Sequence, residues 1–186
     1  FSFPEEDTDK TIVFDLKTGI TIKDLSFSYT EEKSVLNHLD LQINKGDYLA
    51  IVGKTGCGKT TLIKLLMGLY EANEGEILYD GVDIGQISKH SLYNIIGMVM
   101  QDNFLFNMTI RENLLLANEN ATDEEITDAC KKANIYDFII GLPNGFETVI
   151  GERGVKLTGG QKQRISIAAA LLRKPKIIIF DEATSS

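Results

Sequence analysis

The sequence predicts an α/β fold with a mostly parallel core sheet, an antiparallel β-subdomain near the N-terminus and an inserted α-helical subdomain. Three patterns support this prediction. An apolar segment at residues 48–52 runs into glycines and then into leucines 62, 65, 66 and 69, the spacing of one helix face. Residues 177–180 are four consecutive apolar residues, typical of a strand covered on both faces. Between residues 12 and 47, apolar and polar residues alternate as in short strands.

The composition indicates one ordinary globular domain. The chain has 186 residues, 43% of them hydrophobic, and a formal net charge of −8. This acidic balance argues against a nucleic acid as the main partner. The longest apolar runs, residues 95–100 and 167–172, are too short to span a bilayer. Two cysteines, Cys57 and Cys130, provide neither a disulfide framework nor zinc spacing, which favours a reducing compartment.

The N-terminal part is expected to begin with a linker. Residues 1–10 carry a proline and four carboxylates, and we interpret them as a solvated connection from an upstream region. Residues 75–80 and 95–100 are expected to form further strands.

Helices are predicted in the middle of the chain, in a subdomain at about 103–156. Thr109 and Thr122 each precede a glutamate by three residues, the spacing of a capping box at a helix start. The second helix places Ile126, Ala129, Cys130 and Ala133 on one face, so Cys130 is expected to be a core residue, and the helical block should end near residue 142 before Pro-Asn-Gly.

A third capping box, Thr158 with Gln161, predicts another helix. Its buried face should contain Ile165, Ala168, Ala169 and Leu172, and the helix should stop at Pro175.

Residues 53–60, GKTGCGKT, have the spacing of a phosphate-binding loop between a strand and a helix. Glycines let successive backbone amides face phosphate oxygens, and the helix N-terminus adds partial positive charge. Lys59 would reach the β- and γ-phosphates, and Thr60 would offer a hydroxyl to Mg²⁺. The alternative is an ordinary glycine-rich turn, which the matching strand and helix make less favourable.

Acidic residues follow the apolar run at 177–180. Asp181 suits Mg²⁺ binding, and Glu182, on the opposite side of an extended chain, could polarise a water for attack on the γ-phosphate. Asp-Glu pairs also occur in solvated loops, so this pattern gains its weight from the glycine loop. The segment LTGGQ, residues 157–161, supplies a second glycine-lined helix start, and we expect it to close over a nucleotide held by another copy.

Taken together, these motifs resemble the nucleotide-binding domain of ATP-binding cassette (ABC) transporters over nearly the whole chain. GKTGCGKTT is similar to the family's Walker A motif, IIIFDE to Walker B with the catalytic glutamate, and LTGGQ to the signature, with threonine in place of serine. The resemblance implies that ATP and Mg²⁺ are bound. The implied phosphate and signature contacts are Gly53, Lys54, Thr55, Gly56, Cys57, Gly58, Lys59, Thr60, Thr61, Thr158, Gly159, Gly160 and Gln161.

Two further residues are implied by position. Tyr29 lies where the family has an aromatic that stacks on adenine, and this position favours the stacking role over the alternative of a strand-face aromatic. Gln101 matches the Q-loop residue that contacts Mg²⁺ or the attacking water. The implied catalytic set is Glu182, Gln101 and Lys59, and the implied metal ligands are Thr60, Gln101 and Asp181.

Exporter-type features are also present. DNFLF at 102–106, TIRENL at 109–114 and TVIGERG at 148–154 resemble the exporter version of this domain. Phe104, Leu105 and Phe106 are either a docking surface for a transmembrane partner or a packed core turn.

The resemblance implies a domain that hydrolyses ATP to power export across a membrane. Its implied partners are a second such domain, in a homodimer, and a transmembrane domain in the same full-length chain. The implied location is the cytoplasmic face of the cell membrane, as part of an integral membrane protein. The family's distal histidine lies beyond the signature and Walker B, and neither His38 nor His90 takes that place, so residues 11–186 are expected to be a domain truncated before it. The alternatives are a soluble ABC-type ATPase acting on DNA or ribosomes, and a P-loop kinase.

Overall fold

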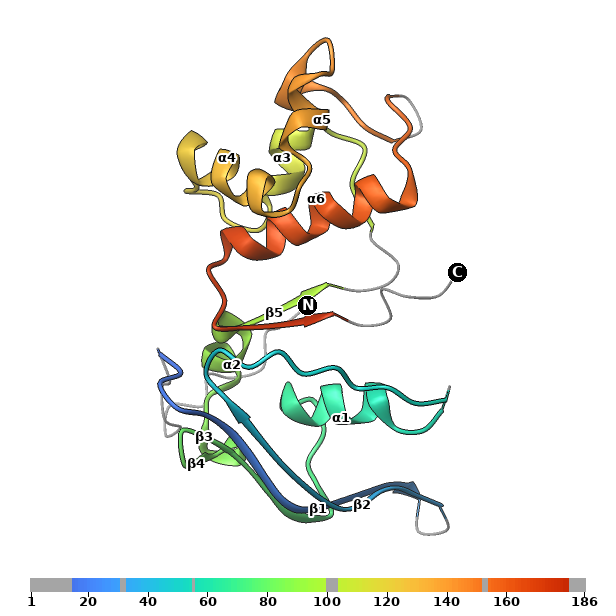
Figure 1. Ribbon diagram of the computed structural model, residues 1–186, viewed down its shortest axis with the longest axis vertical. Helices are drawn as coiled ribbons and strands as arrows, with labels where there is room; N and C mark the ends of the chain where they lie inside the picture. Colours follow the sequence, from blue (N-terminus) through green and yellow to red (C-terminus); the bar gives the residue numbers. More distant parts are fainter. Residues whose placement is uncertain (1–14, 31–32, 55, 100–103, 152–153, 181–186) are drawn as a thin grey trace, which may run out of the picture. The chain divides into compact units, whose positions relative to one another are not determined.

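The computed structural model describes residues 15–30, 33–54, 56–99, 104–151 and 154–180 (Figure 1). The chain divides into two compact units, Phe1–Ile96 and Gly97–Ser186. The linker expected at residues 1–10, and the strand pattern up to residue 14, lie outside the described residues.

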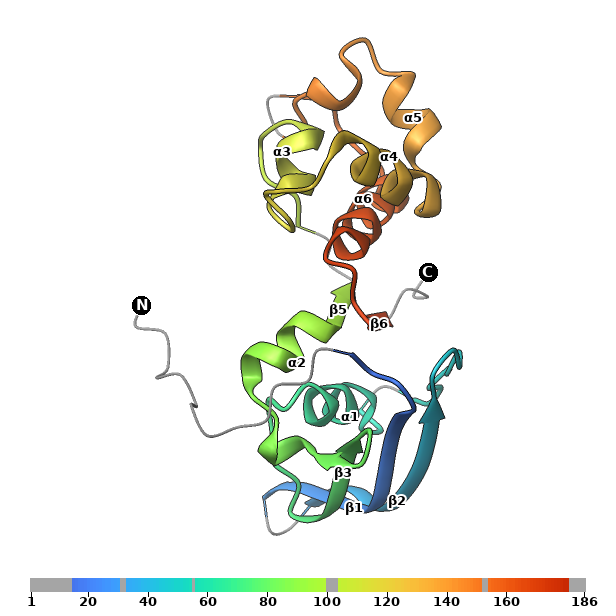
Figure 2. The ribbon, with the colours of Figure 1, turned by 90° about the vertical axis from the view of Figure 1, so that its left-hand side faces the viewer.

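The first unit is built on a four-stranded antiparallel sheet in the order β2-β1-β3-β4. Its helix α1 lies against one face of this sheet (Figures 1 and 2). The elements are β1 (Gly19–Thr30), β2 (Lys33–Asn44), α1 (Lys59–Leu66), β3 (Glu74–Tyr79), β4 (Val82–Asp83), the 3-10 turn η1 (Ile84–Gln86) and α2 (Lys89–Ile95).

The predicted short strands are in fact two strands of twelve residues each. Ile20 and Ile22 pair with Ile43 and Leu41, and this alternation turns the apolar side chains toward α1. Asp24 and His38 have positive φ angles of 47° and 46°, and the register shifts beside them. These irregularities keep each strand continuous while it bends.

A buried tyrosine joins the sheet to the helix. Tyr79 is fully buried on β3, and its hydroxyl donates a 2.6 Å hydrogen bond to the carbonyl of Leu66 at the end of α1. Burial raises the pKa of Tyr79 well above its ordinary value, so the hydroxyl stays protonated and remains a donor.

Two predictions for this unit were wrong. Residues 48–52 are not a strand: no neighbouring strand pairs with them among the described residues, and Tyr48 and Val52 are exposed. A strand needs a hydrogen-bonding neighbour, which an apolar run cannot specify by itself. Leu69 does not extend the buried face of α1, because Met67 caps that helix, Gly68 follows with φ 66°, and Leu69 is 62% exposed.

The second unit combines a two-stranded sheet with a helical cluster. Strands β5 (Ile96–Val99) and β6 (Ile177–Phe180) pair, and their arrows run in the same direction in Figure 1, so they form the parallel part of the α/β fold. The helical elements are α3 (Ile110–Leu115), α4 (Asp123–Lys132), α5 (Tyr136–Ile140), the 3-10 turn η2 (Gly145–Glu147) and α6 (Gly159–Leu172). The side chains of β6 are only half-buried, and that of Phe180 is exposed, so the expected cover on both faces is incomplete.

All three predicted capping boxes are present. Thr109, Thr122 and Thr158 each accept the N–H of the residue three positions later, and the Glu or Gln at that position accepts the threonine N–H. The helical block ends with α5 at Ile140, close to the predicted residue 142, and it is divided at Asn134, which has φ 55° and separates α4 from α5.

The helical core includes the four residues predicted on α4. Ile126, Ala129, Cys130 and Ala133 are buried, and burial raises the pKa of the Cys130 thiol to about 12, which makes it unreactive. On α6, Ile165, Ala168 and Leu172 are buried as predicted, but Ala169 is half-buried and Ala170 is buried instead. No helix in the described ranges has the length and apolar character needed to cross a bilayer.

A single carboxylate fixes the entry into β1. Asp80, at the end of β3, accepts hydrogen bonds from the N–H groups of Lys17, Thr18 and Gly19 and from the Thr18 hydroxyl, at 2.6–2.9 Å. Partial burial acts to raise the pKa of Asp80, but these four hydrogen bonds outweigh it and hold the pKa well below its ordinary value.

Replacing this carboxylate should therefore destabilise the fold. Asp80→Asn removes the negative charge that the donors share, and we expect the free energy of unfolding at pH 7 to fall by about 1–3 kcal/mol. Because the pKa of Asp80 is lowered by folding, its ionised carboxylate contributes its full stability at pH values above the pKa of an unfolded aspartate, about 3.9. The contribution decreases below that pH and is lost as the pH falls through the folded pKa. Urea unfolding at pH 7 and at pH 3 measures both effects.

Glu71→Gln is the matched control, because Glu71 is an exposed carboxylate of the same unit. Its unfolding should be nearly unchanged at both pH values. Equal stability of Asp80→Asn and Glu71→Gln at pH 7 would contradict this role for Asp80.

Candidate nucleotide-binding site

The glycine loop leads into a helix whose first turn has free donors. The N-cap of α1 is Gly58, with φ 103°, and no side chain caps this end. The N–H groups in the first turn of a helix have no acceptor within the helix. Those of Lys59, Thr60 and Thr61 therefore face outward together with the positive end of the helix dipole, an arrangement that binds anions such as phosphate.

Close packing against β2 requires glycine at the N-cap. A Cβ atom on Gly58 would lie 3.1 Å from side-chain carbons of both Val35 and Leu36, and 3.2 Å from the Val35 carbonyl oxygen. Gly56 also has a left-handed conformation, with φ 81°. The loop thus gains its shape from glycine conformations and its position from β2.

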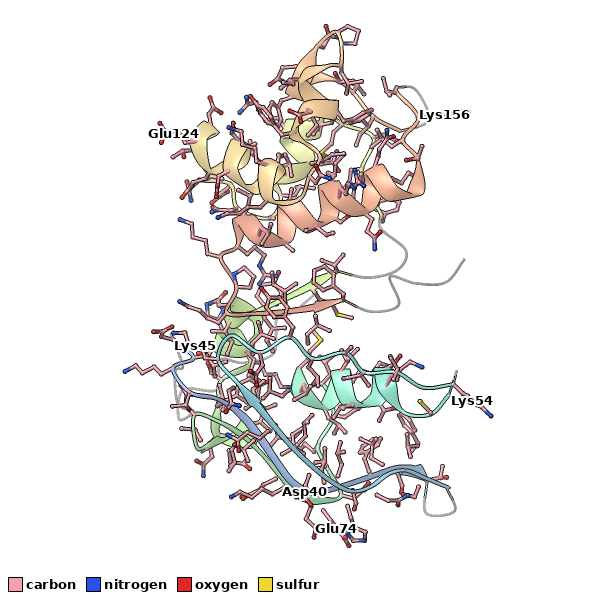
Figure 3. All side chains as sticks on the ribbon, in the orientation of Figure 1. Asp40, Lys45, Lys54, Glu74, Glu124 and Lys156 are labelled. Carbon is pink, nitrogen blue, oxygen red and sulfur yellow. The ribbon has the colours of Figure 1, made fainter. Side chains whose placement is uncertain are left out.

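The ammonium group of Lys59 lies within the loop. Its Nζ donates to the carbonyl oxygens of Gly53 at 2.7 Å and Lys54 at 3.1 Å, and it is 3.9 Å from Cys57 Sγ. The Lys54 side chain, in contrast, is exposed and points away from the rest of the unit (Figure 3). The positive charge at the centre of the loop therefore belongs to Lys59.

Tyr29 is connected to the same helix. Its hydroxyl is 2.9 Å from the hydroxyl of Thr61, which is buried on α1. Tyr29 is 54% exposed, so it lies at the surface where a ligand could reach it. The structure thus brings the predicted adenine-stacking residue to the helix that carries the phosphate loop.

The second glycine-lined helix start belongs to the other unit. Gly159 and Gly160 are exposed, and a Cβ atom on either would meet nothing within 4 Å. The capping box uses the N–H of Gln161, which donates to Thr158 Oγ1 at 3.2 Å. The N–H groups of Gly159 and Gly160 have no acceptor in their own helix. The end of α6 can therefore approach an anion on another molecule closely.

Four of the predicted site residues, Thr55, Gln101, Asp181 and Glu182, lie outside the described residues. Strand β6 ends at Phe180, immediately before the two acidic positions. Within the described part of the chain, no group of three or more His, Cys, Asp or Glu side chains could hold a metal ion. The predicted Mg²⁺ ligands thus remain a prediction from the sequence.

Sequence reasoning missed one aromatic residue near the site. Tyr70 packs its ring edge-to-face with Tyr29, the ring centroids being 5.6 Å apart. It lies after the end of α1 and belongs to no motif used in the sequence analysis. The sequence pattern does not indicate that a tyrosine four residues after a helix will contact a strand from about forty residues earlier in the chain.

The fold and this loop define the class of P-loop NTPases, because a glycine-rich turn runs into an uncapped helix start with a lysine in its first turn. The family model described as "ABC transporter" matches residues 36–185. The chain belongs to the ABC transporter family.

Proteins similar to this chain have names that describe export. The chain is 47% identical over 172 residues to YgaD of Bacillus subtilis (strain 168), named as a multidrug export ATP-binding/permease protein. It is 50% identical over 174 residues to a Staphylococcus aureus (strain NCTC 8325) protein named in the same way. Each alignment covers 92% of this chain and 30% of the relative.

A solved structure is also similar over the whole chain. The structure of a bacterial Atm1-family ABC exporter with ATP bound matches with a TM-score of 0.83 and 39% sequence identity. The match covers 100% of this chain and 32% of the exporter chain. The chain thus spans about a third of the length of the proteins it resembles.

Adding one methyl group to the N-cap should disrupt the loop. Gly58→Ala forces a left-handed alanine, at about 1–2 kcal/mol, and pushes its Cβ toward Val35 and Leu36. Each N–H bond to a charged phosphate that loses alignment is worth about 1.5–3 kcal/mol, so ATP affinity should fall about tenfold or more. Equilibrium binding of MgATP to the purified full-length protein measures this loss.

Gly46→Ala provides the matched control. Gly46 also has a positive φ angle, 89°, but a Cβ atom there would meet nothing within 4 Å. It should lower stability by a similar conformational cost and leave ATP affinity unchanged. Equal ATP affinities of the two variants would argue against a binding role for the N-cap.

The two cysteines should differ in reactivity. Cys57 is exposed in the glycine loop, whereas Cys130 is buried. A maleimide should modify Cys57, block nucleotide binding and be slowed by bound ATP, while Cys130 of the folded protein remains unmodified. Mass spectrometry after labelling with and without ATP identifies the modified site. A Cys57→Ala protein whose ATP binding stays equally sensitive to the reagent would rule out this explanation.

Proposed function

We propose that this chain is the ATP-binding and ATP-hydrolysing domain of an exporter. The observation that carries the proposal is the uncapped, glycine-lined start of α1 with Lys59 at its centre, in a chain of the ABC transporter family. The names of its relatives favour export over a soluble ATPase or a kinase.

The first part of the proposal concerns the triphosphate. The N–H groups at the start of α1 and the Lys59 ammonium would bind the β- and γ-phosphates, and Tyr29 would stack on adenine. Stacking on an aromatic ring tolerates other bases, so the proposal does not require strict selectivity for ATP.

The second part concerns Mg²⁺. The Thr60 side chain is exposed at the mouth of the loop, and hydroxyl, carboxylate and amide oxygens are ligands that Mg²⁺ accepts. Thr60, Asp181 and Gln101 would hold the ion. When bound, it would neutralise negative charge on the phosphates.

Hydrolysis is assigned to Glu182. Its carboxylate would accept a proton from the attacking water, while the bond between the γ-phosphorus and the ADP oxygen breaks. Gln101 would orient the same water, and Lys59 would neutralise charge on the phosphates. General-base assistance of this kind contributes about 10²–10⁴-fold to the rate.

A second copy of the domain would complete the site. In this arrangement, the Gly159 and Gly160 N–H groups of one copy contact the γ-phosphate held by the other, since they are exposed and have no acceptor within α6. ATP would then join the two copies, and hydrolysis would release them.

The transmembrane partner would meet an exposed aromatic pair. Phe104 is 76% and Phe106 is 49% exposed, and their rings pack edge-to-face with centroids 5.1 Å apart. Two adjacent exposed phenylalanines favour the docking alternative over a packed core turn. The transmembrane domain would belong to the same protein, as in relatives named ATP-binding/permease, and the domain would lie on the cytoplasmic face of the membrane.

Glu182→Gln tests both hydrolysis and dimerisation. In the full-length protein, this variant should bind MgATP with nearly unchanged affinity and hydrolyse it about 10²–10⁴-fold more slowly. Phosphate release measures turnover. Light scattering on the separately expressed domain should show a dimer that persists with ATP and not with ADP.

The exposed Glu119 offers a matched charge-removing control. Glu119→Gln should keep the wild-type turnover. Wild-type turnover in Glu182→Gln would exclude Glu182 as the general base. A domain that stays monomeric with ATP would exclude the proposed dimer.

A further inference from the structure

Three aromatic rings pack together beside α1, the helix that follows the phosphate loop. The ring of Tyr29 is nearly perpendicular to those of Phe27 and Tyr70, at 87° and 89°, with centroid distances of 5.0 and 5.6 Å. Phe27 and Tyr70 are stacked on each other, 5.7 Å apart and 23° between planes. Edge-to-face and offset-stacked pairs are both favourable geometries. Tyr29 is therefore held from two directions.

The segment that carries Tyr70 is tied to the strand that carries Tyr29. The N–H of Ser28 donates a 2.6 Å hydrogen bond to Asn73 Oδ1, and the N–H of Asn73 donates a 3.1 Å hydrogen bond to the carbonyl of Ser26. Ser28 lies between Phe27 and Tyr29 on β1. The position of Tyr70 relative to Tyr29 is thus set by the backbone as well as by ring packing.

The cluster is also attached to α1 at two points. The Thr61 hydroxyl contacts the Tyr29 hydroxyl at 2.9 Å, and the Lys64 ammonium lies 5.3 Å from the centre of the Tyr70 ring, within cation–π range. Thr61 and Lys64 are three residues apart and so share one side of the helix. The helix that begins at the phosphate loop therefore also fixes the aromatic rings.

We propose that Tyr70 is a positioning residue for nucleotide binding: it holds the Tyr29 ring in the orientation that receives the base. This inference rests on the proposed stacking role of Tyr29. Tyr29 is 54% exposed, and without its neighbours such a side chain would sample several rotamers. Holding the ring before the ligand arrives removes the entropy cost of ordering it on binding.

Removing the Tyr70 ring is expected to weaken only the binding of the nucleotide base. Tyr70→Ala in the full-length protein should weaken MgATP binding about 3–10-fold, the loss expected when one side chain must be ordered on binding. It should leave the binding of magnesium tripolyphosphate, which has the phosphates and no base, unchanged. Tyr70→Phe keeps the ring and should bind ATP like the wild type, and Tyr70→Leu keeps apolar volume if the alanine variant folds poorly.

A double-mutant cycle distinguishes positioning from direct contact. If Tyr70 acts through Tyr29, Tyr70→Ala should have no further effect on ATP affinity in a Tyr29→Ala protein. The neighbouring Leu69, exposed and outside the ring cluster, gives the control Leu69→Ala, which should bind both ligands normally.

Each outcome decides the inference. The inference would be overturned if Tyr70→Ala lowered the affinities for ATP and tripolyphosphate equally, or if it lowered neither. It would also be overturned if Tyr70→Ala had its full effect on ATP affinity in the Tyr29→Ala protein. Unchanged ATP affinity in Tyr29→Ala alone would overturn the stacking role in the proposed function, and the positioning role with it. A loss in Tyr29→Ala but none in Tyr70→Ala or Tyr70→Leu would overturn the positioning role only.

Discussion

The first unit depends on one close approach between a helix start and a strand. Gly58 lets α1 begin against Val35 and Leu36, and because glycine has no side chain, the N-terminus of α1 has no side-chain cap. In most helices a side chain satisfies some of these N–H groups. Here they stay available, and Lys59 adds its charge at the same place. The uncapped end gives up the stability that a capping side chain would add, and it leaves the N–H donors that the proposed phosphate binding needs.

The sheet and the aromatic cluster give that helix start a fixed surrounding. Asp80 holds the entry into β1, Tyr79 joins β3 to the end of α1, and Thr61 and Lys64 contact the rings of Tyr29 and Tyr70. These contacts join segments up to 63 residues apart in the sequence. The phosphate loop and the proposed base-stacking ring therefore belong to one network of contacts, which would reduce the ordering needed on binding.

Local signals were predicted well because their physics is local. Each capping box needs only two side chains three residues apart, and all three are present at Thr109, Thr122 and Thr158. Cys130 lies on an apolar helix face and is buried as expected. The errors arose where a distant partner decides the outcome, as at residues 48–52, which have no neighbouring strand among the residues described. The prediction that Leu69 belongs to the buried helix face was wrong for a related reason, because helical spacing cannot show that the helix has already ended before Gly68.

The sequence by itself determined the fold class and the family, and it indicated the phosphate-binding chemistry that we propose for the loop, since glycine spacing, a lysine and a helix start are encoded within a few consecutive residues. Only the tertiary structure decided why Gly58 must be glycine and which residues surround Tyr29. Both depend on contacts between β1, β2, α1 and the segment after it, and a ring such as Tyr70 gains its role only when folding brings it to Tyr29. Contacts of this kind are set by packing and backbone hydrogen bonds across the unit, which no short motif specifies.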